Sequence, residues 1–257
     1  MNLEKIKSKL STGTGVAVEY HDTLDSTNEY AKASSSPDNT LIVCGHQTKG
    51  RGRFNRVWQA EKGSDLTFTL VKCLRVPMDE IVLVNFYKTY ILYKTLKESF
   101  PDDTDVSLKW PNDILVNSRK ISGILIEVKE INKPEKKFII GAGINVNQES
   151  FPEDIAQKAT SMFIESDKKI EREDLLCSII NAFYENLDLV NNKEQLLKLW
   201  KDNFSYINKE IKIRKFVDDE EIPAIVRDIG VDGGLIVEHG DGSRSTYYSG
   251  EISLSYK

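Results

Sequence analysis

The chain of 257 residues has few of the residues that build disulfide scaffolds or metal centres. It contains three cysteines and three histidines, and the cysteines are odd in number, widely spaced and set among apolar neighbours. No spacing among them matches a metal-ligand set or a disulfide framework. We therefore expect Cys44, Cys73 and Cys177 to be small buried hydrophobic residues, and we expect the chemistry to reside in other residue types.

Long apolar runs and an excess of positive charge are also absent. Residues 1–7 contain no apolar signal core, and no stretch reaches the uninterrupted apolar length of a membrane helix. The sequence therefore predicts a cytoplasmic protein that does not engage a membrane. A net charge of -5 argues against a protein whose main task is to bind nucleic acid, although it leaves room for a local basic patch. We find no internal repeat, low-complexity tract or GxGxxG dinucleotide fingerprint.

The most concentrated chemistry lies in residues 50–58, with the sequence GRGRFNRVW. Alternating glycines let a backbone approach a ligand closely, and guanidinium groups suit phosphate and carboxylate. Similar arginine-glycine runs occur in disordered nucleic-acid-binding arms. Here, however, the run lies between an apolar segment, 41–45, and an alternating segment, 66–70. We predict an anion-binding loop between two strands.

Upstream of this loop, residues 15–20 predict a strand that leads into a helix beginning at Ser26. Ser26 and Glu29 have the spacing of a capping box. This pattern has two interpretations, which the local sequence leaves open. It is either a helix cap alone, or a polar pocket formed by a helix N-terminus with its free N–H groups.

Further elements follow from periodicity and turn residues. A helix is predicted after Pro77, with Asp79 as its cap, and helical spacing recurs over 171–190 and 195–200. Residues 106–127 contain turn formers and predict three short strands.

Lysines and glycines mark two of these predicted strand regions. Lys109 and Lys120 bracket the first two short strands, so hairpin folding would bring them together unless they are simply two exposed lysines. Residues 138–147 predict an apolar strand in which Gly141 and Gly143 indicate close backbone packing or a bulge.

The composition changes near residue 205. The remaining residues form short alternating runs separated by glycines, which is typical of a small all-β domain, barrel-like at this size. We therefore predict two domains, 1–204 and 205–257.

Three motifs occur together in a specific order: GRGR followed by a tryptophan, KWPNDI followed by the lysine of RKISGILIE, and GAGINVN. In this combination the chain resembles the biotin protein ligases, and the C-terminal IGVDGGLIV and SGEISL segments resemble that family's SH3-like domain. The resemblance implies an α+β catalytic domain, with a mixed sheet flanked by helices, and a small C-terminal SH3-like β-barrel. It also implies ATP-dependent conversion of biotin to biotinyl-5′-AMP and transfer to a lysine of a biotin carboxyl carrier domain.

The resemblance also implies roles for individual residues. The implied catalytic residues are Lys120, Arg51 and Lys109. The implied biotin-binding residues are Ser26, Thr27, Asn28, Gln47, Arg51, Gly52, Arg53, Lys120 and Gly123. The implied ATP- and adenylate-binding residues are Arg51, Arg53, Arg56, Trp58, Lys109, Asn112, Lys120 and Asn145. Asp113 is the implied residue for Mg²⁺, which would accompany ATP.

The chain departs from the family pattern in the arginine loop. The family sequence commonly reads GRGRRGR, whereas Phe54 and Asn55 here replace an arginine and a glycine. Some family members also carry an N-terminal helix-turn-helix and act as repressors. Because we find no such motif before the first predicted strand, we expect neither DNA binding nor a repressor role. The oligomeric state stays open, with a homodimer as one outcome.

Three alternative functions remain open at this point. A lipoate ligase shares the two-step chemistry, but lipoate lacks the ureido ring that Ser26, Thr27, Asn28 and Gln47 would bind. A non-catalytic nucleic-acid-binding module would use the arginine loop and would bind DNA in a salt-sensitive manner. A pseudoenzyme would bind biotin without activating it, although Lys109 and Lys120 argue against this.

Overall fold

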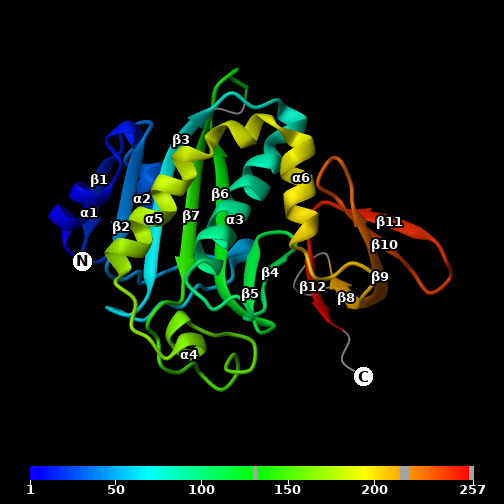
Figure 1. The fold of residues 1–257 in the computed structure, drawn as a ribbon. Helices are drawn as coiled ribbons and strands as arrows, with labels where there is room; N and C mark the ends of the chain where they lie inside the picture. The colour runs from blue at the N-terminus through cyan, green and yellow to red at the C-terminus, as the bar shows by residue number, and fades with distance from the viewer. Residues whose placement is uncertain (130–131, 215–219, 255–257) are drawn as a thin grey trace.

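The computed structural model describes residues 1–129, 132–214 and 220–254, which form two β-sheets and the helices that cover them (Figure 1). The strands are β1 Ala17–His21, β2 Thr40–Cys44, β3 Leu66–Leu74, β4 Val106–Lys109, β5 Asp113–Val116, β6 Arg119–Lys129, β7 Lys136–Ile144, β8 Glu210–Arg214, β9 Ile222–Ile229, β10 Leu235–Glu238, β11 Arg244–Tyr247 and β12 Glu251–Leu254. The α-helices are α1 Leu3–Lys9, α2 Thr27–Ala33, α3 Ile81–Lys97, α4 Met162–Ser166, α5 Arg172–Glu185 and α6 Lys193–Asp202.

The first sheet has seven strands in the order β1-β2-β3-β7-β6-β5-β4. β1 pairs with β2 in parallel, and the other neighbouring strands are antiparallel. The predicted mixed sheet is therefore confirmed. β3 and β7 pair over nine residues at the centre of the sheet, from Leu66 with Ile144 to Leu74 with Lys136.

Helices cover both faces of this sheet. α3 and α5 lie on one face in Figure 1, and Ile140 of β7 packs into the large core beneath them. Its neighbour Ile139 points to the opposite face, as the two-residue period of a strand requires, and packs with Ala31 of α2. The predicted arrangement of a sheet flanked by helices is thus confirmed, and the N-terminus of α2 is placed at the end of β2 where the site lies.

The helix predicted after Pro77 forms as α3, but its predicted cap is wrong. Asp79 lies within a 3₁₀ turn, Met78–Glu80, and the N-cap residue is Glu80, whose side chain makes no capping hydrogen bond. The 3₁₀ turn provides the first backbone bond instead, from the amide of Glu80 to the carbonyl of Pro77. Tight turns of this kind are common at helix N-termini.

The second sheet contains five antiparallel strands in the order β11-β10-β9-β8-β12. It confirms the predicted all-β C-terminal region, whereas the boundary after residue 204 stays a prediction. The sheet packs against the rest of the protein through α6 and the turn between β4 and β5. Lys201 of α6 forms an ion pair with Asp228 of β9 at 2.7 Å, and the indole N–H of Trp110 in the turn donates to the carbonyl of Gly233 at 3.2 Å.

The cysteines follow the expectation in part. Cys44 and Cys177 are buried, whereas Cys73 is half-buried, so its predicted burial is incomplete. Burial raises the pKa of all three thiols, which disfavours the reactive thiolate. Over the described residues, the structure contains no helix long and apolar enough to span a bilayer.

Candidate functional site

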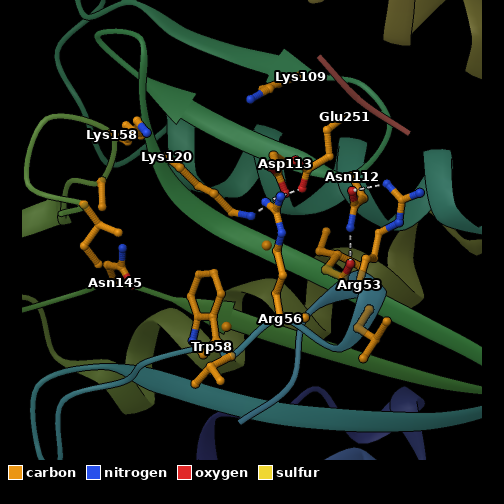
Figure 2. Close-up of a pocket in the computed structure, with 18 of the residues that line it drawn as sticks. Arg53, Arg56, Trp58, Lys109, Asn112, Asp113, Lys120, Asn145, Lys158 and Glu251 are labelled. Atoms are coloured by element: carbon orange, nitrogen blue, oxygen red, sulfur yellow. Dashed lines mark hydrogen bonds and ion pairs between the residues drawn. The ribbon is translucent and has the colours of Figure 1, made fainter. Parts of the chain in front are cut away.

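A cavity of about 880 Å³ lies beside the arginine loop, between one end of the main sheet and β12 of the second sheet (Figure 2). Every residue for which the sequence predicted a binding or catalytic role lines this cavity. The structure therefore brings these residues together from the start of α2, the segment after β2, the arginine loop, the strands β4, β5 and β6 with the turn between the first two, and the residue that follows β7, although the role of each one stays a prediction.

One end of the cavity is polar but uncharged and is formed by the N-terminus of α2. Ser26, Thr27 and Asn28 are all buried there. The Oε1 atom of Gln47 accepts hydrogen bonds from the amide of Thr27 at 2.8 Å and from its hydroxyl at 3.1 Å. The hydroxyl of Thr69 lies 2.7 Å from both Thr27 Oγ1 and Asn28 Oδ1. These contacts fix a set of donors and acceptors that can recognise a neutral polar group.

The predicted capping box does not form at this helix. Ser26 is the N-cap residue, but its side chain makes no capping hydrogen bond. The carboxylate of Glu29 instead accepts from Lys32 and from Arg51. Because Gln47 already bonds the amide of Thr27, the helix start is stabilised from outside α2, and Ser26 is left to line the cavity.

The floor of the cavity is formed by glycines of the strands β6 and β7. A Cβ atom on Gly141 would overlap the amide group of Asn28, and one on Gly143 would overlap the indole of Trp58. A Cβ atom on Gly123 would lie 3.0 Å from the Trp58 ring and 3.1 Å from the Lys120 amine. The close packing predicted for Gly141 and Gly143 is confirmed, and it lets Trp58 lie flat against β6 and β7.

The other end of the cavity is cationic. Lys120 on β6 forms an ion pair with Asp113 at 2.7 Å, and Lys109 is the register partner of Asp113 on the neighbouring strand β4. Lys109 and Lys120 thus meet in one region, which decides between the two interpretations of this pair. Burial lowers the pKa of Lys109; the nearby Lys120 acts in the same direction, while Asp113 opposes them.

The arginine loop folds as a short hairpin, residues 50–58, which we call the arginine hairpin. Arg51 pairs with Val57 in an antiparallel bridge, and the amide of Trp58 donates to the carbonyl of Gly50 at 2.9 Å. Phe54 lies near its tip with a φ of 54°, a conformation that is uncommon for a residue with a side chain. The hairpin lies between β2 and β3, as predicted for a loop joining two strands.

Two arginines of the hairpin are held by groups around the cavity. Arg53 lies 3.3 Å from both Asn112 Oδ1 and the carbonyl of Gly250, and the amide of Asn112 donates in turn to the carbonyl of Ile124. Arg56 forms an ion pair with Glu251 (Figure 2). Burial lowers the pKa of Arg53, whereas the negative charge of Asp113 opposes that effect. The cations are thus fixed around the cavity by protein partners.

Sequence reasoning missed two parts of the cavity. Gly250 precedes β12 and Glu251 begins it, and no local pattern links them to the arginine hairpin. Lys158 lies on the segment that follows β7, which bonds to β6 beside Lys120: the amide of Lys120 donates to the carbonyl of Lys158 at 2.8 Å. The lysine itself was visible in the sequence, but nothing there indicated that its segment returns to the sheet.

Asp113 alone does not make a metal site. No cluster of three or more histidine, cysteine or acidic residues that could hold a metal occurs in 1–129, 132–214 or 220–254. One carboxylate oxygen of Asp113 is also paired with the amine of Lys120. This donor set fits only an ion that arrives with oxygen ligands of its own, as Mg²⁺ bound to nucleotide phosphates does.

Comparison with family models gives two matches. Residues 20–145 match the model described as the Biotin/lipoate A/B protein ligase family, and residues 206–255 match the Biotin protein ligase C terminal domain. The first match contains the arginine hairpin, Lys109, Lys120 and Asn145, while the second contains Glu251.

Two relatives differ in how much they share with the chain. Bifunctional ligase/repressor BirA of Bacillus subtilis is 34% identical over 169 residues, which are 64% of this chain and 51% of that protein. The BirA of Escherichia coli is 26% identical over 258 residues, or 99% of this chain and 78% of the relative. The match thus spans about half the length of the Bacillus relative.

Solved structures resemble the whole described fold. The biotin protein ligase from Aquifex aeolicus in complex with biotin and ATP has a TM-score of 0.77 and 28% identity, covering 93% of this chain and 99% of that one. The biotin protein ligase from Leishmania major in complex with biotinyl-5-AMP has a TM-score of 0.63 and 22% identity over 90% of this chain and 98% of that one. At that identity the second likeness shows the fold alone.

Proposed function

We propose that this chain, which belongs to the Biotin/lipoate A/B protein ligase family, is a biotin protein ligase that forms biotinyl-5′-AMP and transfers its biotinyl group to a carrier lysine. The observation that carries this proposal is that the two ends of a single cavity differ in charge. Its α2 end presents uncharged hydrogen-bonding groups, and its β4–β6 end presents lysines and arginines. Such a cavity fits an acid with a neutral polar head and a carboxylate that must meet a phosphate.

The uncharged end favours biotin over lipoate. A ureido ring needs both donors and acceptors, and the side chains of Ser26, Thr27 and Gln47 supply them. Since Thr27 occupies Oε1 of Gln47, the amide Nε2 of that residue can donate towards the ring. The first family model spans biotin and lipoate ligases alike, whereas the C-terminal model and the Aquifex structure name biotin alone.

The cationic end suits the activating step. A carboxylate oxygen of biotin attacks the α-phosphorus of ATP, the bond to the β-phosphate oxygen breaks, and pyrophosphate leaves. Lys120, Lys109 and Arg56 surround the place where this charge develops. Cations that are already positioned stabilise developing charge without reorganising at the moment of reaction.

The transfer step needs no nucleophile from the protein. The carrier amine attacks the acyl carbon of biotinyl-5′-AMP, the bond from that carbon to the phosphate oxygen breaks, and AMP leaves as the amine loses a proton. Cys44, Cys73 and Cys177 lie outside the set of residues that line the cavity, and burial raises the pKa of each thiol. A hairpin that covers the cavity would exclude water, which competes for the mixed anhydride.

Magnesium is proposed to enter with ATP. Bound to the β- and γ-phosphates, it would neutralise the leaving group, and Asp113 is the carboxylate of the cavity that could contact it. Lys120 would then exchange its ion pair with Asp113 for the substrates.

The acceptor we propose is the biotin carboxyl carrier domain of a biotin-dependent carboxylase, in the cytoplasm. A relative from Mycobacterium tuberculosis, 24% identical over 82% of this chain, is named biotin–[acetyl-CoA-carboxylase] ligase. We also propose that the chain forms a homodimer and that its two domains divide after residue 204.

The test is mass spectrometry of the products formed when the purified protein is incubated with biotin, ATP and Mg²⁺, with lipoate as a parallel sample. We expect biotinyl-5′-AMP with biotin, no adenylate with lipoate, and loss of product when EDTA removes the metal. Adenylate from lipoate alone would make the chain a lipoate ligase. Biotin binding without adenylate would make it a pseudoenzyme.

A variant tests the role of Lys120. Lys120→Ala should reduce adenylate formation by about two to four orders of magnitude, because it removes a cation placed at the developing charge. Far-UV circular dichroism controls for the fold. Near-normal activity of Lys120→Ala would overturn the role assigned to it.

A further inference from the structure

The arginine hairpin is tied to the body of the protein on two opposite sides. On the side of the second sheet, Arg53 and Arg56 contact Gly250 and Glu251. On the side of α2, Nη1 of Arg51 lies 2.6 Å from Oε1 of Glu29. The second tie lies at the α2 end of the cavity, one residue beyond Asn28.

Glu29 is held in place by a row of alternating charges. The amine of Lys32 lies 2.5 Å from Glu29 Oε1 and 2.8 Å from Glu127 Oε1 on β6, and Glu127 also accepts from the amide of Asn28 at 2.9 Å. The hydrogen bond from Lys32 lowers the pKa of Glu29; partial burial opposes it, and Arg51 reinforces it. Glu29 is therefore an ionised carboxylate in a fixed position.

The root of the hairpin is fixed independently of Glu29. The amide of Leu24 donates to the carbonyl of His46 at 3.1 Å, and the amide of Lys49 donates to the carbonyl of Asp25 at 2.9 Å. Opening of the hairpin must therefore begin after Lys49. Arg51 is the first charged side chain beyond this point, so its ion pair with Glu29 holds the moving part against α2.

We infer that Glu29 is a positioning residue that keeps the arginine hairpin closed over the α2 end of the cavity through Arg51, and thereby slows the release of the acid bound there. This inference rests on the proposed function, since it takes biotin as the ligand. The pair is partly exposed, with side-chain exposures of 53% for Arg51 and 37% for Glu29. Such a pair is weak enough to break in every turnover.

The rate of biotin dissociation tests this inference. Full-length protein loaded with radiolabelled biotin is chased with unlabelled biotin in the absence of ATP. Glu29→Gln should release biotin about two- to five-fold faster than the wild type, the range expected for a partly exposed ion pair. Arg51→Gln should be at least as fast, and the double variant should be no faster than Arg51→Gln, because both changes break one contact.

Two variants serve as controls. Lys49→Gln removes an exposed ion pair with Asp25 at the fixed root of the same hairpin, and should release biotin at the wild-type rate. Lys32→Gln removes the other partner of Glu29 and leaves Arg51 in place, so its release should stay within about two-fold of the wild type. High salt should bring the wild type towards the rate of Glu29→Gln, which a purely structural role of Glu29 would not produce.

The outcomes separate the inference from the proposed function. If the wild type fails to bind biotin, the proposed function is wrong. If biotin binds but Glu29→Gln releases it at the wild-type rate, the hairpin is not held by this pair and the inference alone fails. Release from Lys32→Gln as fast as from Glu29→Gln would likewise overturn it, because Glu29 would then act through the stability of α2.

Discussion

At the scale of single residues, Lys88 is a lysine buried among apolar residues of the core. It is buried in α3, where its amine donates to the carbonyl of Gly141 at 2.9 Å and no described carboxylate pairs with it. Burial lowers its pKa well below the ordinary value of 10.5. Burial therefore disfavours the charged form of Lys88, and its amine binds the carbonyl of Gly141 in the strand that forms the cavity floor.

The lowered pKa of Lys88 predicts a particular pH dependence of stability. Between the lowered pKa of the folded state and the ordinary pKa, the unfolded chain binds a proton that the folded chain does not, so stability should rise with pH. We expect the free energy of unfolding of the wild type, relative to Lys88→Met, to increase with pH in the range below the ordinary pKa of 10.5, with a limiting slope of about 1.4 kcal/mol per pH unit. Urea unfolding of both proteins at several pH values measures this slope. Parallel curves would mean that Lys88 is charged in the folded protein.

A second residue-scale prediction concerns the cavity floor. Gly143→Ala places a methyl group where the Trp58 indole lies, so the ring must move. Overpacking of this kind costs about 1–3 kcal/mol, and we expect ATP to bind about 5- to 100-fold more weakly by isothermal titration calorimetry. Gly13→Ala is the matched control, because nothing lies within 4 Å of its added Cβ atom. Equal affinities of the two variants for ATP would contradict the close packing of Trp58 on Gly143.

The sequence showed which residues were unusual, but it did not show which groups would contact them in the folded protein. Gly141 and Gly143 could be recognised as sites of close approach, because a glycine pair inside an apolar strand is unusual. Nothing identified Trp58 and Asn28 as the groups that approach, because those contacts depend on the folding of distant segments. Lys88 was likewise indistinguishable from an exposed lysine of the same helix.

At the scale of elements, the arginine hairpin depends on β12 for its position. Glu251 accepts from Arg56 of the hairpin and from Arg214 of β8, with Arg214 Nη2 at 2.9 Å. The second sheet thus holds the hairpin by a carboxylate shared between two guanidinium groups. A charge removed at this point should loosen the hairpin and leave the sheet folded.

Hydrogen exchange measures this dependence. Glu251→Gln should increase amide exchange in residues 50–58 by about two- to five-fold, because Arg56 loses its ion pair while the side chain keeps its size. Glu238→Gln is the control: Glu238 also joins two arginines, Arg227 and Arg244, but it does not line the cavity. Equal exchange in the two variants would show that the hairpin keeps its position without the ion pair to Glu251.

Elements were predictable where they are local. The periodicity of α3 and the turn residues between β4, β5 and β6 act within a few residues, so pattern and structure agree. The start of α2 was placed correctly but for the wrong physical reason, since Gln47 rather than a capping box bonds the amide of Thr27. β11 lacked a strong alternating apolar pattern and was not predicted.

At the scale of the whole molecule, one hydrophobic core runs through both sheets. Phe86 and Trp200 belong to it, as do Ile211 of β8 and Val226 of β9. Trp110, beside the cavity, donates to the second sheet at Gly233. The two sheets therefore share buried surface where the cavity is built between them.

We expect the two sheets to unfold in one transition. Tryptophan fluorescence and far-UV circular dichroism should give the same urea midpoint, because separating the sheets would expose their common core. Trp110→Phe should lower that midpoint through the lost hydrogen bond to Gly233, by about 0.5–1.5 kcal/mol in free energy, without splitting the transition. Separate midpoints for the wild type would mean that the sheets fold independently.

The three motifs together predicted this architecture. They did not predict how the C-terminal sheet contacts the catalytic residues. Each motif places charged or small residues within a few positions of one another. Arg56 and Glu251 lie far apart in the sequence, so only the folded molecule shows that β12 completes the cavity.

The position of Trp58 gives the protein an intrinsic optical reporter. Of the three tryptophans, Trp110 and Trp200 are 1% and 0% exposed, while Trp58 is half-buried, lines the cavity and has no described partner for its indole N–H. A nucleotide base or an acyl chain that reaches the cavity must change the surroundings of this indole, whereas Trp200 lies outside the cavity lining and Trp110, which also lines the cavity, is almost fully buried. The emission of the unlabelled protein should therefore follow each filling and emptying of the site in real time, and Trp58→Phe should remove most of that signal.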